Sequence, residues 1–471
     1  MNGKRRLDLP AALAALALLS GCVQAPMRPD LERIYRSSAE AQVDATPVIV
    51  IPGLFGSKLR EPHSGEEVWP GDWQRVLFSD YRELALDPGP NREGKPAASP
   101  LEAFDLADRV LGIDFYGPLI DTLARFGGYR PGRPGQAVPP GERRYYVFAY
   151  DWRQDNVQHA AALDALIEQI RRDYGKPDLR VDIVAHSMGG IVARYYLRYG
   201  PHDVLDGQPS LISLYGTERV RKLVLLGTPN FGAVSALHGF LRGEPIGFKR
   251  MPPEVVASMP SAYQLFPHPL AEWGVDSAGQ ALHDDLYDPA TWQRLGWALY
   301  DPEVAARVTA QSDAAAEGEV KLAALRRQFT HSLERARRLA WMLSTPEPAS
   351  PVRYVLFGGN CAPTPAKLAV ETVAGRSFTR LKPSELTSPR PGVRFDELML
   401  EPGDGRVTKP SLLARETLDA SAPQHEEAVL PIAYYFFLCE RHDQLTSNIN
   451  FQDNLLHILL TRQLPWDTPG R

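Results

Sequence analysis

The sequence has only three cysteines in 471 residues, no excess of basic residues and no internal repeat. Its formal net charge is −5, and the lysines and arginines are scattered along the chain. It also lacks zinc-finger spacing and any pattern of stacking aromatic residues, so nothing favours a nucleic-acid partner. A composition of 44% hydrophobic and 23% charged residues is ordinary for a globular protein.

Long hydrophobic runs are missing as well, with one short exception at the N-terminus. Residues 1–21 combine a basic start, a short apolar stretch and small residues, which is the pattern of a secretory signal peptide. The apolar stretch is too short to span a bilayer as a permanent helix. It ends at Leu19-Ser20-Gly21-Cys22, which resembles the lipobox of bacterial lipoproteins and predicts lipidation of Cys22. An ordinary signal peptide that contains a cysteine is the alternative interpretation.

Lipidation would anchor the protein in a bacterial cell envelope. Residue 23 is valine and not aspartate. In this it resembles bacterial lipoproteins that are sorted to the outer membrane and not to the inner membrane. Residues 22–45 are polar and mixed, and we expect them to form a tether to the folded body. Processing would leave Cys361 and Cys439, and an even pair in an exported protein can form a disulfide.

After residue 45, short apolar runs rich in β-branched and aromatic residues are separated in several places by helical stretches. Near-continuous apolar strands of this kind are typical of a parallel sheet that is covered by helices on both faces. The candidate strands lie at residues 46–53, 143–152, 180–186, 221–229, 351–359 and 432–439.

A helix is expected between the second and third of these strands. Asp155 or Asn156 can cap its start, and Gly175 can end it, which makes one βαβ unit. Further helices are expected at residues 188–200 and 451–463.

Two long insertions interrupt this order. Residues 54–142 are rich in glycine and proline and have no clear periodicity, whereas residues 233–350 are mostly helical in pattern. Loops this long within a compact domain usually act as lids or caps. We therefore expect an α/β core formed by residues 46–232 and 351–465, with the 54–142 insertion inside it and a helical cap over residues 233–350.

The third strand ends abruptly at Ala185-His186-Ser187-Met188-Gly189. A serine between small residues, after a strand and before a helix, is the pattern of a nucleophile elbow. Alanine replaces the usual first glycine and is the next smallest residue, so the packing requirement is still met. A glycine-rich strand end with an incidental serine is the alternative, and the strand–helix context favours the nucleophile.

A serine hydroxyl needs a base to remove its proton, and in this arrangement the acid and then the histidine follow the serine along the chain. Three histidines lie late enough. His457 falls in a helical apolar pattern and His425 precedes the last strand, whereas His442 comes directly after that strand. We therefore predict that His442 is the base.

The acid should orient the base and stabilise its protonated form. Asp404 lies between two glycines after the penultimate strand, where a carboxylate can point without crowding. Asp396 and Asp419 are the competitors, and both are expected to be solvated surface charges. We predict that Asp404 is the acid.

The developing oxyanion needs hydrogen-bond donors that are already in place. One donor should be the backbone N–H of Met188, directly after the serine. The second should come from the loop after the first strand, where Leu54 follows Pro52-Gly53. A simple glycine turn after a strand is the alternative for Leu54.

Several of these segments together resemble one family, the lecithin:cholesterol acyltransferase family, which includes lysosomal phospholipases and bacterial relatives. The resemblance runs from about residue 46 to residue 463 and is weakest in the insertions. The segments that carry it are PVIVIPGLFGSKL, YVFAYDWR, VDIVAHSMGGIVARYYL, VLLGTPNFGA, PSAYQLFP, PGDGRVT and ERHDQLTSNINFQDNLL.

The resemblance implies an α/β-hydrolase fold and an acyl-serine intermediate that passes to water or to an alcohol, without a cofactor or a metal. It implies the roles of nucleophile, acid and base for Ser187, Asp404 and His442, and of oxyanion donors for the Leu54 and Met188 amides.

The sequence departs from the family at two places. Ala185 stands where the family has glycine, and a cysteine pair near the start of the mature chain is absent. The second departure puts the family's disulfide-closed membrane-binding loop in doubt. Trp69 and Trp73 can belong either to a lipid interface or to the core.

Two further contacts are expected around the site. Asp151 and Arg153 should form a buried ion pair that supports the loop after the second strand, and a contact with the substrate is the alternative. Cys361 lies just after one strand, and Cys439 lies at the end of what should be the neighbouring strand. Neighbouring strands run about 4.8 Å apart, so we predict a disulfide between the two cysteines.

The sequence thus predicts a lipid-anchored serine esterase that acts on acyl esters of phospholipids or neutral lipids. Net acyl transfer to a sterol or another alcohol is the alternative within the same chemistry. An amidase or thioesterase with the same triad remains open, as does a non-catalytic envelope lipoprotein that retains the hydrolase fold.

Overall fold

The computed structural model describes residues 28–461 except 42–44, 90–98, 111–112, 208–210, 349, 420 and 427. The predicted signal peptide and Cys22 lie outside the described residues. In the described part of the chain, no helix is both long enough and apolar enough to cross a bilayer.

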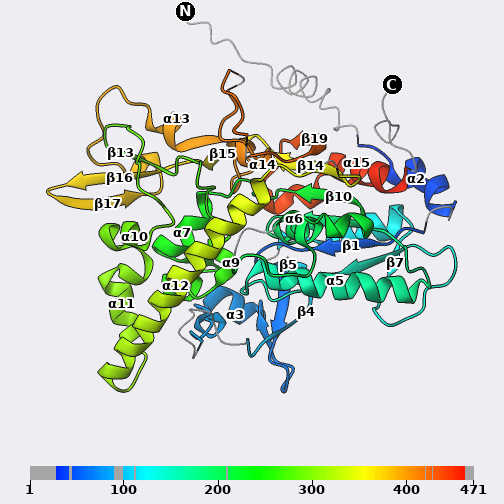
Figure 1. Cartoon of the computed structure of the whole chain (residues 1–471), viewed down its shortest axis with the longest axis horizontal. Coiled ribbons are helices and arrows are strands. Elements are labelled where there is room, and N and C mark those ends of the chain that lie inside the picture. The colour runs from blue at the N-terminus through cyan, green and yellow to red at the C-terminus, as the bar shows by residue number, and fades with distance from the viewer. Residues whose placement is uncertain are drawn as a thin grey trace, which may run out of the picture.

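A seven-stranded parallel sheet forms the centre of the molecule (Figure 1). All six predicted strands are present, and β7 is an additional edge strand that has no apolar pattern. In spatial order the strands are β19 (Ile432–Leu438), β14 (Arg353–Gly359), β10 (Val220–Leu226), β9 (Val181–His186), β1 (Val48–Ile51), β8 (Arg144–Val147) and β7 (Arg130–Pro131).

The order of the strands reverses next to β1. From β1 the chain adds β8 and β7 on one side, and it then returns to build β9, β10, β14 and β19 on the other. In open α/β sheets, ligands bind at the carboxyl ends of the strands beside such a switch point. The reversal therefore places the end of β9 where a site is expected.

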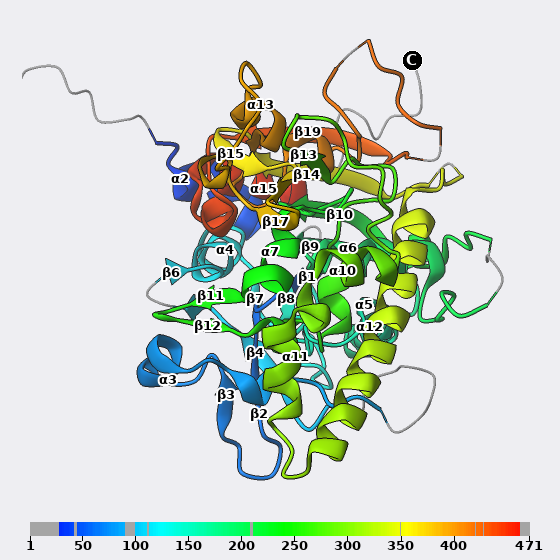
Figure 2. The ribbon, with the colours of Figure 1, turned by 90° about the vertical axis from the view of Figure 1, so that its left-hand side faces the viewer.

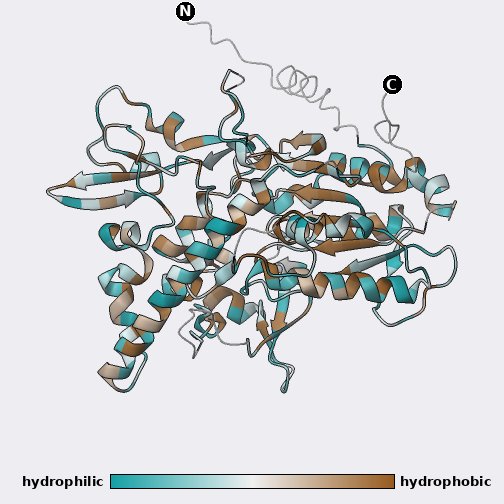
Figure 3. Cartoon of the chain, viewed as in Figure 1, coloured by the Kyte–Doolittle hydropathy of each residue, from teal (hydrophilic) through white to brown (hydrophobic). Residues whose placement is uncertain are grey.

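Helices cover both faces of the sheet, as predicted from the apolar strands. Ile49 and Ile51 face the cluster that contains α5 (Asn156–Asp173) and α6 (Gly189–Tyr199). Their neighbours on β1 face the opposite cluster, which contains α15 (Ile449–Leu460), because side chains alternate along a strand. Figure 3 shows hydrophobic residues along these strands and mixed hydropathy along α5.

The predicted tether is partly a packed helix, α2 (Leu31–Glu40), which lies beside α15 (Figure 1). Leu31 and Tyr35 are one helical turn apart and are buried against Leu456, and the Tyr35 hydroxyl donates to Asp453 at 2.7 Å. This part of the predicted tether is therefore a helix that packs on the folded body. Its apolar residues are few, but they fall on one face.

The first insertion is only partly separate from the core. Its N-terminal part forms a small antiparallel sheet and α3, while its C-terminal part returns to the core as α4, η2 and β7. Its elements are β2 (Ser57–Arg60), β3 (Glu67–Trp69), α3 (Trp73–Phe78), η1 (Arg82–Leu84), β4 (Glu102–Leu106), β5 (Arg109–Val110), β6 (Ile113–Asp114), α4 (Gly117–Asp121) and η2 (Thr122–Phe126).

The second insertion is mostly helical, as its pattern predicts, and its helices α10 and α11 lie to the left of the sheet in Figure 1 and face the viewer in Figure 2. Before this insertion, between α6 and β10, the core contributes η3 (Tyr215–Glu218). The insertion comprises α7 (Ser235–Arg242), β11 (Glu244–Ile246), β12 (Lys249–Met251), α8 (Pro253–Val256), α9 (Pro260–Tyr263), β13 (Gly274–Asp276), α10 (Pro289–Leu295), η4 (Ala298–Tyr300), α11 (Pro302–Thr309) and α12 (Ala315–Ser344).

The predicted boundary at residue 350 does not separate cap from core cleanly. Strand β13 pairs in parallel with β16, so residues after β14 join the cap through backbone hydrogen bonds. The elements between β14 and α15, apart from β19, are β15 (Ala362–Pro365), β16 (Leu368–Val373), β17 (Arg376–Arg380), η5 (Pro383–Glu385), α13 (Phe395–Met399), β18 (Leu400–Gly403), α14 (Lys409–Leu412) and η6 (His442–Ser447).

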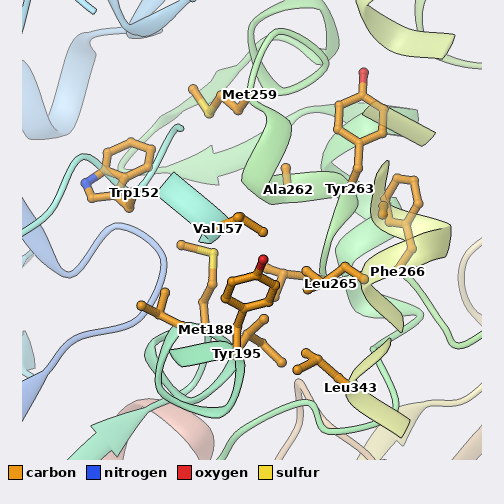
Figure 4. Close-up of a cluster of buried hydrophobic side chains, with 14 of the residues drawn as sticks. Trp152, Val157, Met188, Tyr195, Met259, Ala262, Tyr263, Leu265, Phe266 and Leu343 are labelled. Carbon is orange, nitrogen blue, oxygen red and sulfur yellow. The ribbon is translucent and has the colours of Figure 1, made fainter. Parts of the chain in front are cut away.

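The cap is packed firmly onto the core. Met188 and Tyr195 of the core share one apolar cluster with Leu265 of the cap and Leu343 of α12 (Figure 4). The guanidinium of Arg335 on α12 is buried and lies 2.6 Å from the Asp155 carboxylate, which also caps α5. These contacts fix α12 against the core in this structure.

Candidate active site

Ser187 occupies a tight corner between β9 and α6. Its φ angle is +52°, a left-handed conformation that is strained for a side chain larger than glycine. The two glycines that follow allow α6 to start at once, since a Cβ on Gly189 would lie 2.5 Å from the Pro52 carbonyl oxygen. A Cβ on Gly190 would lie 2.0 Å from Thr228 Oγ1. The local geometry is that of the predicted elbow.

The structure brings together the three residues that the sequence placed far apart. His442 Nε2 lies 3.0 Å from Ser187 Oγ, and His442 Nδ1 lies 2.8 Å from Asp404 Oδ2. His442 begins η6 directly after β19, and Asp404 follows β18. The hydroxyl, imidazole and carboxylate therefore form one continuous hydrogen-bonded chain.

The competing acids and bases lie elsewhere. The side chains of all four competing residues are exposed. Asp396 is on α13. His457 is on the outer face of α15, so the prediction that it packs within a helix interface is wrong. The four competing residues are Asp396, Asp419, His425 and His457.

Asp404 is almost fully buried and yet remains ionised. Burial alone would raise the pKa of its carboxyl group. The His442 imidazole and the backbone N–H groups of Val407 and Arg406 lower the pKa by more than burial raises it, so the pKa lies below its usual value. Because the carboxylate can only accept, His442 Nδ1 must donate to it. Nε2 then carries the lone pair that faces the Ser187 hydroxyl.

A disulfide joins Cys361 and Cys439 just beyond the ends of β14 and β19. The Asn360 N–H donates to the Leu438 carbonyl at 3.1 Å beside it. Gly359 is also required here, because a Cβ would lie 2.7 Å from the Cβ of Asp404. The disulfide thus braces the two loops that carry Asp404 and His442.

The loop after β1 passes directly over Ser187. A Cβ on Gly53 would lie 2.8 Å from Ser187 Cβ, and the Gly56 N–H donates to the Gly53 carbonyl at 3.0 Å to close a turn. Leu54 lies inside this turn and lines the cavity above the serine. Met188 precedes α6, on the other side of the same corner. Both residues are thus beside the serine, and their role as donors stays a prediction.

A cavity of about 380 Å³ opens above Ser187 and His442. Its walls are mainly apolar and come from the core, the first insertion and the cap, whereas charged groups lie along part of the lining. Apolar lining residues are Leu54, Phe55, Trp69, Ala107, Phe115, Pro229, Ala233, Ala236, Pro245, Ile246, Val256, Met259, Ala262, Leu265 and Val407. The charged ones besides Asp404 are Glu244, Arg406, Arg441 and Asp443.

The structure places Trp69 in the core and Trp73 at the surface, and it pairs Asp151 with Arg153. Trp69 is buried and donates from Nε1 to the Phe55 carbonyl at 2.8 Å, whereas the side chain of Trp73 is 67% exposed. Arg153 is fully buried and lies 2.8 Å from the Asp151 carboxylate. The Asp151–Arg153 pair is structural, as expected.

Two residues beside the site were not singled out by the sequence analysis. Tyr116 lies in the first insertion, and its hydroxyl is 2.9 Å from His186 Nδ1 and accepts from the Gly53 N–H at 2.9 Å. His186 precedes the nucleophile, but no pattern indicated what its ring contacts. Only the return of the first insertion to the core brings Tyr116 here.

Comparison with known proteins supports the resemblance inferred from the motifs. Residues 137–297 match the model of the lecithin:cholesterol acyltransferase family. The lysosomal phospholipase A and acyltransferase of Rattus norvegicus is 29% identical over 147 residues, 31% of this chain and 29% of that protein. The Bos taurus protein of the same description is 29% identical over 129 residues, 27% of this chain and 26% of that protein. The resemblance is thereby confirmed.

These matches have a limited extent. The chain aligns with less than a third of the length of each of those two relatives. The matched family segment includes Ser187 but ends before Asp404 and His442. The link between the three residues therefore depends on the geometry described above.

A solved structure shares the fold. A chain in the crystal structure of the Tle4-Tli4 complex has a TM-score of 0.54 and 17% sequence identity, and the match covers 88% of this chain and 98% of that one. Together with the parallel sheet, its helices on both faces and the elbow at the end of β9, this identifies an α/β-hydrolase fold.

Proposed function

We propose that this protein is a serine acyl-ester hydrolase or acyltransferase that acts on lipids through an acyl-serine intermediate. The observation that carries the proposal is the continuous chain from Ser187 Oγ through His442 to Asp404, at 3.0 and 2.8 Å, below an apolar cavity. An unactivated serine has no need of such a chain.

The geometry supports the following sequence of steps. His442 Nε2 takes the proton of Ser187 as Oγ attacks the ester carbonyl carbon, and the carbonyl oxygen becomes an oxyanion that accepts from the Leu54 and Met188 N–H groups. The ester C–O bond then breaks, and the protonated His442 gives its proton to the leaving alcohol. Water or a second alcohol, deprotonated by His442, then attacks the acyl carbon. The bond from that carbon to Oγ breaks, His442 returns the proton to Oγ, and a fatty acid or a new ester leaves.

A lipid substrate is favoured by the composition of the cavity. Most of the residues around it are apolar, whereas the charged groups are few and include Arg406 and Glu244, which pair with each other at 3.1 Å. An acyl chain can occupy the apolar walls while a polar headgroup remains near the charged residues. The phospholipase and acyltransferase description of the similar Rattus norvegicus protein is consistent with this assignment.

Water and an alcohol are the two candidate acceptors of the acyl group. We expect free fatty acid as the main product when the protein is incubated with radiolabelled phosphatidylethanolamine vesicles. Addition of a long-chain alcohol or a sterol should divert part of the label into a new ester, since both acceptors compete for one acyl-enzyme. Thin-layer chromatography separates the products. The absence of both labelled products with the wild-type protein would contradict the proposed function.

An exposed aromatic pair, with one ring on a hairpin whose first strand lines the cavity, favours action at a lipid surface. Phe248 at the tip of the β11–β12 hairpin is 78% exposed, and its ring centroid lies 6.0 Å from that of Phe78 on α3. Its neighbours Lys249 and Arg250 are also exposed, while Ile246 of the same hairpin lines the cavity. Figure 2 shows the hairpin next to α3. Apolar rings flanked by cations suit the surface of an anionic membrane.

The Phe248→Ala variant should lower the rate on anionic phospholipid vesicles about tenfold, because burial of a phenylalanine side chain stabilises by about 1.5–3 kcal/mol when complete. Hydrolysis of a soluble short-chain ester should remain within about twofold of wild type. Vesicle sedimentation measures binding, and Leu211→Ala, which removes another exposed apolar residue, is the control. Equal losses on both substrates would argue against a role in interfacial binding.

We also propose, from the sequence alone, that a lipid at Cys22 holds the protein in the envelope, on the outer membrane. Cys22 lies outside the described residues. Cells that express the wild-type protein should incorporate labelled palmitate into it, and Cys22→Ala should abolish this incorporation. Incorporation that persists in Cys22→Ala would contradict this part of the proposal.

A further inference from the structure

A buried hydrogen-bonded chain connects the predicted oxyanion loop to the loop of the predicted base. The Gly53 N–H donates to Tyr116 Oη at 2.9 Å, and Tyr116 Oη lies 2.9 Å from His186 Nδ1. On the far side of the ring, His186 Nε2 lies 3.4 Å from the backbone carbonyl oxygen of His442. The rings of His186 and His442 also contact each other, with centroids 4.9 Å apart.

The direction of each hydrogen bond follows from the chemistry of the partners. A backbone N–H can only donate, so the Tyr116 oxygen accepts from Gly53 and its own proton points to His186 Nδ1. His186 must then carry its single proton on Nε2, which faces the carbonyl of His442. Burial lowers the pKa of His186 to about 3, and the nearby His442 lowers it as well, so His186 is neutral in the range where the enzyme would work.

Tyr116 is held at this position from several sides. The turn that contains Leu54 wraps around its hydroxyl, since a Cβ on Gly56 would lie 2.7 Å from Tyr116 Oη. The Thr446 hydroxyl, in the 3₁₀ helix that begins at His442, donates to the carbonyl of Phe115. The Phe115–Tyr116 segment thus contacts both the oxyanion loop and the base loop.

We propose that Tyr116 and His186 are positioning residues that hold the Leu54 amide and the His442 ring at fixed places relative to Ser187. The proposal rests on the proposed function of Ser187, His442 and Asp404. Oxyanion donors act because they are oriented before the reaction begins, and a displacement of about 1 Å can reduce the rate about 100-fold. The Tyr116–His186 chain is the direct link by which one loop fixes the other.

The first test is Tyr116→Phe, which removes only the hydroxyl and keeps the buried ring. We expect kcat on a soluble p-nitrophenyl ester to fall about 10- to 100-fold, with KM within about threefold, because interactions made only in the transition state affect kcat. Tyr287→Phe is the matched control, since it removes another buried hydroxyl, which donates to the Pro267 carbonyl at 2.9 Å. Its kcat should stay within about twofold of wild type.

The second test uses His186 and does not depend on the folding of the tyrosine variant. In His186→Asn, the side-chain oxygen can still accept from Tyr116, whereas His186→Leu can make neither hydrogen bond. We expect the asparagine variant to recover at least about a third of the kcat that the leucine variant loses, at similar melting temperatures.

The outcomes separate this inference from the proposed function. A kcat within twofold of wild type in Tyr116→Phe, or equal losses in Tyr116→Phe and Tyr287→Phe, would overturn the positioning role, as would His186→Asn no better than His186→Leu. Any of these three results leaves the proposed function standing if Ser187→Ala is inactive. Equal activity of Ser187→Ala and wild type would instead remove the function itself.

Discussion

Replacement of Ser187 by alanine should reduce kcat for ester hydrolysis by about 10⁵- to 10⁶-fold, the size of effect seen when the nucleophile of a serine hydrolase is removed. Without Oγ there is no atom to form the acyl-enzyme, so only slow attack of water on an oriented ester remains. The fold should be unaffected, because alanine and serine face the same strain at a φ of +52°. Hydrolysis of p-nitrophenyl butyrate and labelling by a fluorophosphonate are the measurements.

The control for this experiment is a serine outside the cavity. Ser213 donates to the carbonyl of Arg198 at 3.0 Å, and Ser213→Ala should keep both activity and labelling near wild type. Wild-type and Ser187→Ala proteins with the same rate would mean that the site is not catalytic. The protein would then be better explained as an envelope lipoprotein that retains the hydrolase fold.

The sequence could predict the parts of the site that depend on local pattern. The elbow is local, because one strand, one serine and two glycines define it within a few residues. Asp404 and His442 were predicted from loops that follow strands, and a parallel sheet brings all such loops to one edge. The structure places those two residues in hydrogen-bond contact with each other at 2.8 Å.

What the sequence could not predict depends on contacts between distant segments. Tyr116 lies in a stretch without periodicity, and it reaches His186 only because α4 packs under the sheet. The pairing of β13 with β16 crosses the expected boundary between cap and core for the same reason, since backbone hydrogen bonds carry no signal in the side-chain pattern. Buried ion pairs such as Arg335 with Asp155 also leave no pattern in a single sequence from which they could be predicted.

The packing of the cap bears on how a substrate enters. Helix α12 is held through the buried Arg335 and the apolar cluster around Leu343, and removal of one partner from a buried ion pair is strongly destabilising. The β11–β12 hairpin instead has an exposed tip and contacts α3 through the Phe248 N–H, which donates to the Leu77 carbonyl at 3.0 Å. Access to the cavity is therefore expected beside the hairpin and not through movement of α12.

The second large effect is expected for Asp404→Asn, which should lower kcat about 10⁴-fold. The amide group has nearly the same shape as the carboxylate, but its NH₂ can donate to His442 Nδ1 and stabilise the wrong tautomer, with the proton on Nε2. Nε2 then cannot accept the proton of Ser187, although it still lies within reach at 3.0 Å. The backbone N–H groups of Arg406 and Val407, which donate to Oδ1 at 2.9 and 2.7 Å, should still hold the side chain in place.

The same variant should also change how stability depends on pH. Because the folded protein lowers the pKa of Asp404 below its ordinary value of 3.8, the ionised carboxylate stabilises the fold above that pH, and the contribution is lost as the pH falls through the lower folded value. Melting temperatures measured between pH 6 and pH 3 should therefore fall less steeply in Asp404→Asn than in wild type. The exposed Asp396→Asn is the control, and it should retain both wild-type kcat and the wild-type pH dependence. Loss of activity in Asp396→Asn with an active Asp404→Asn would reverse the assignment of the acid.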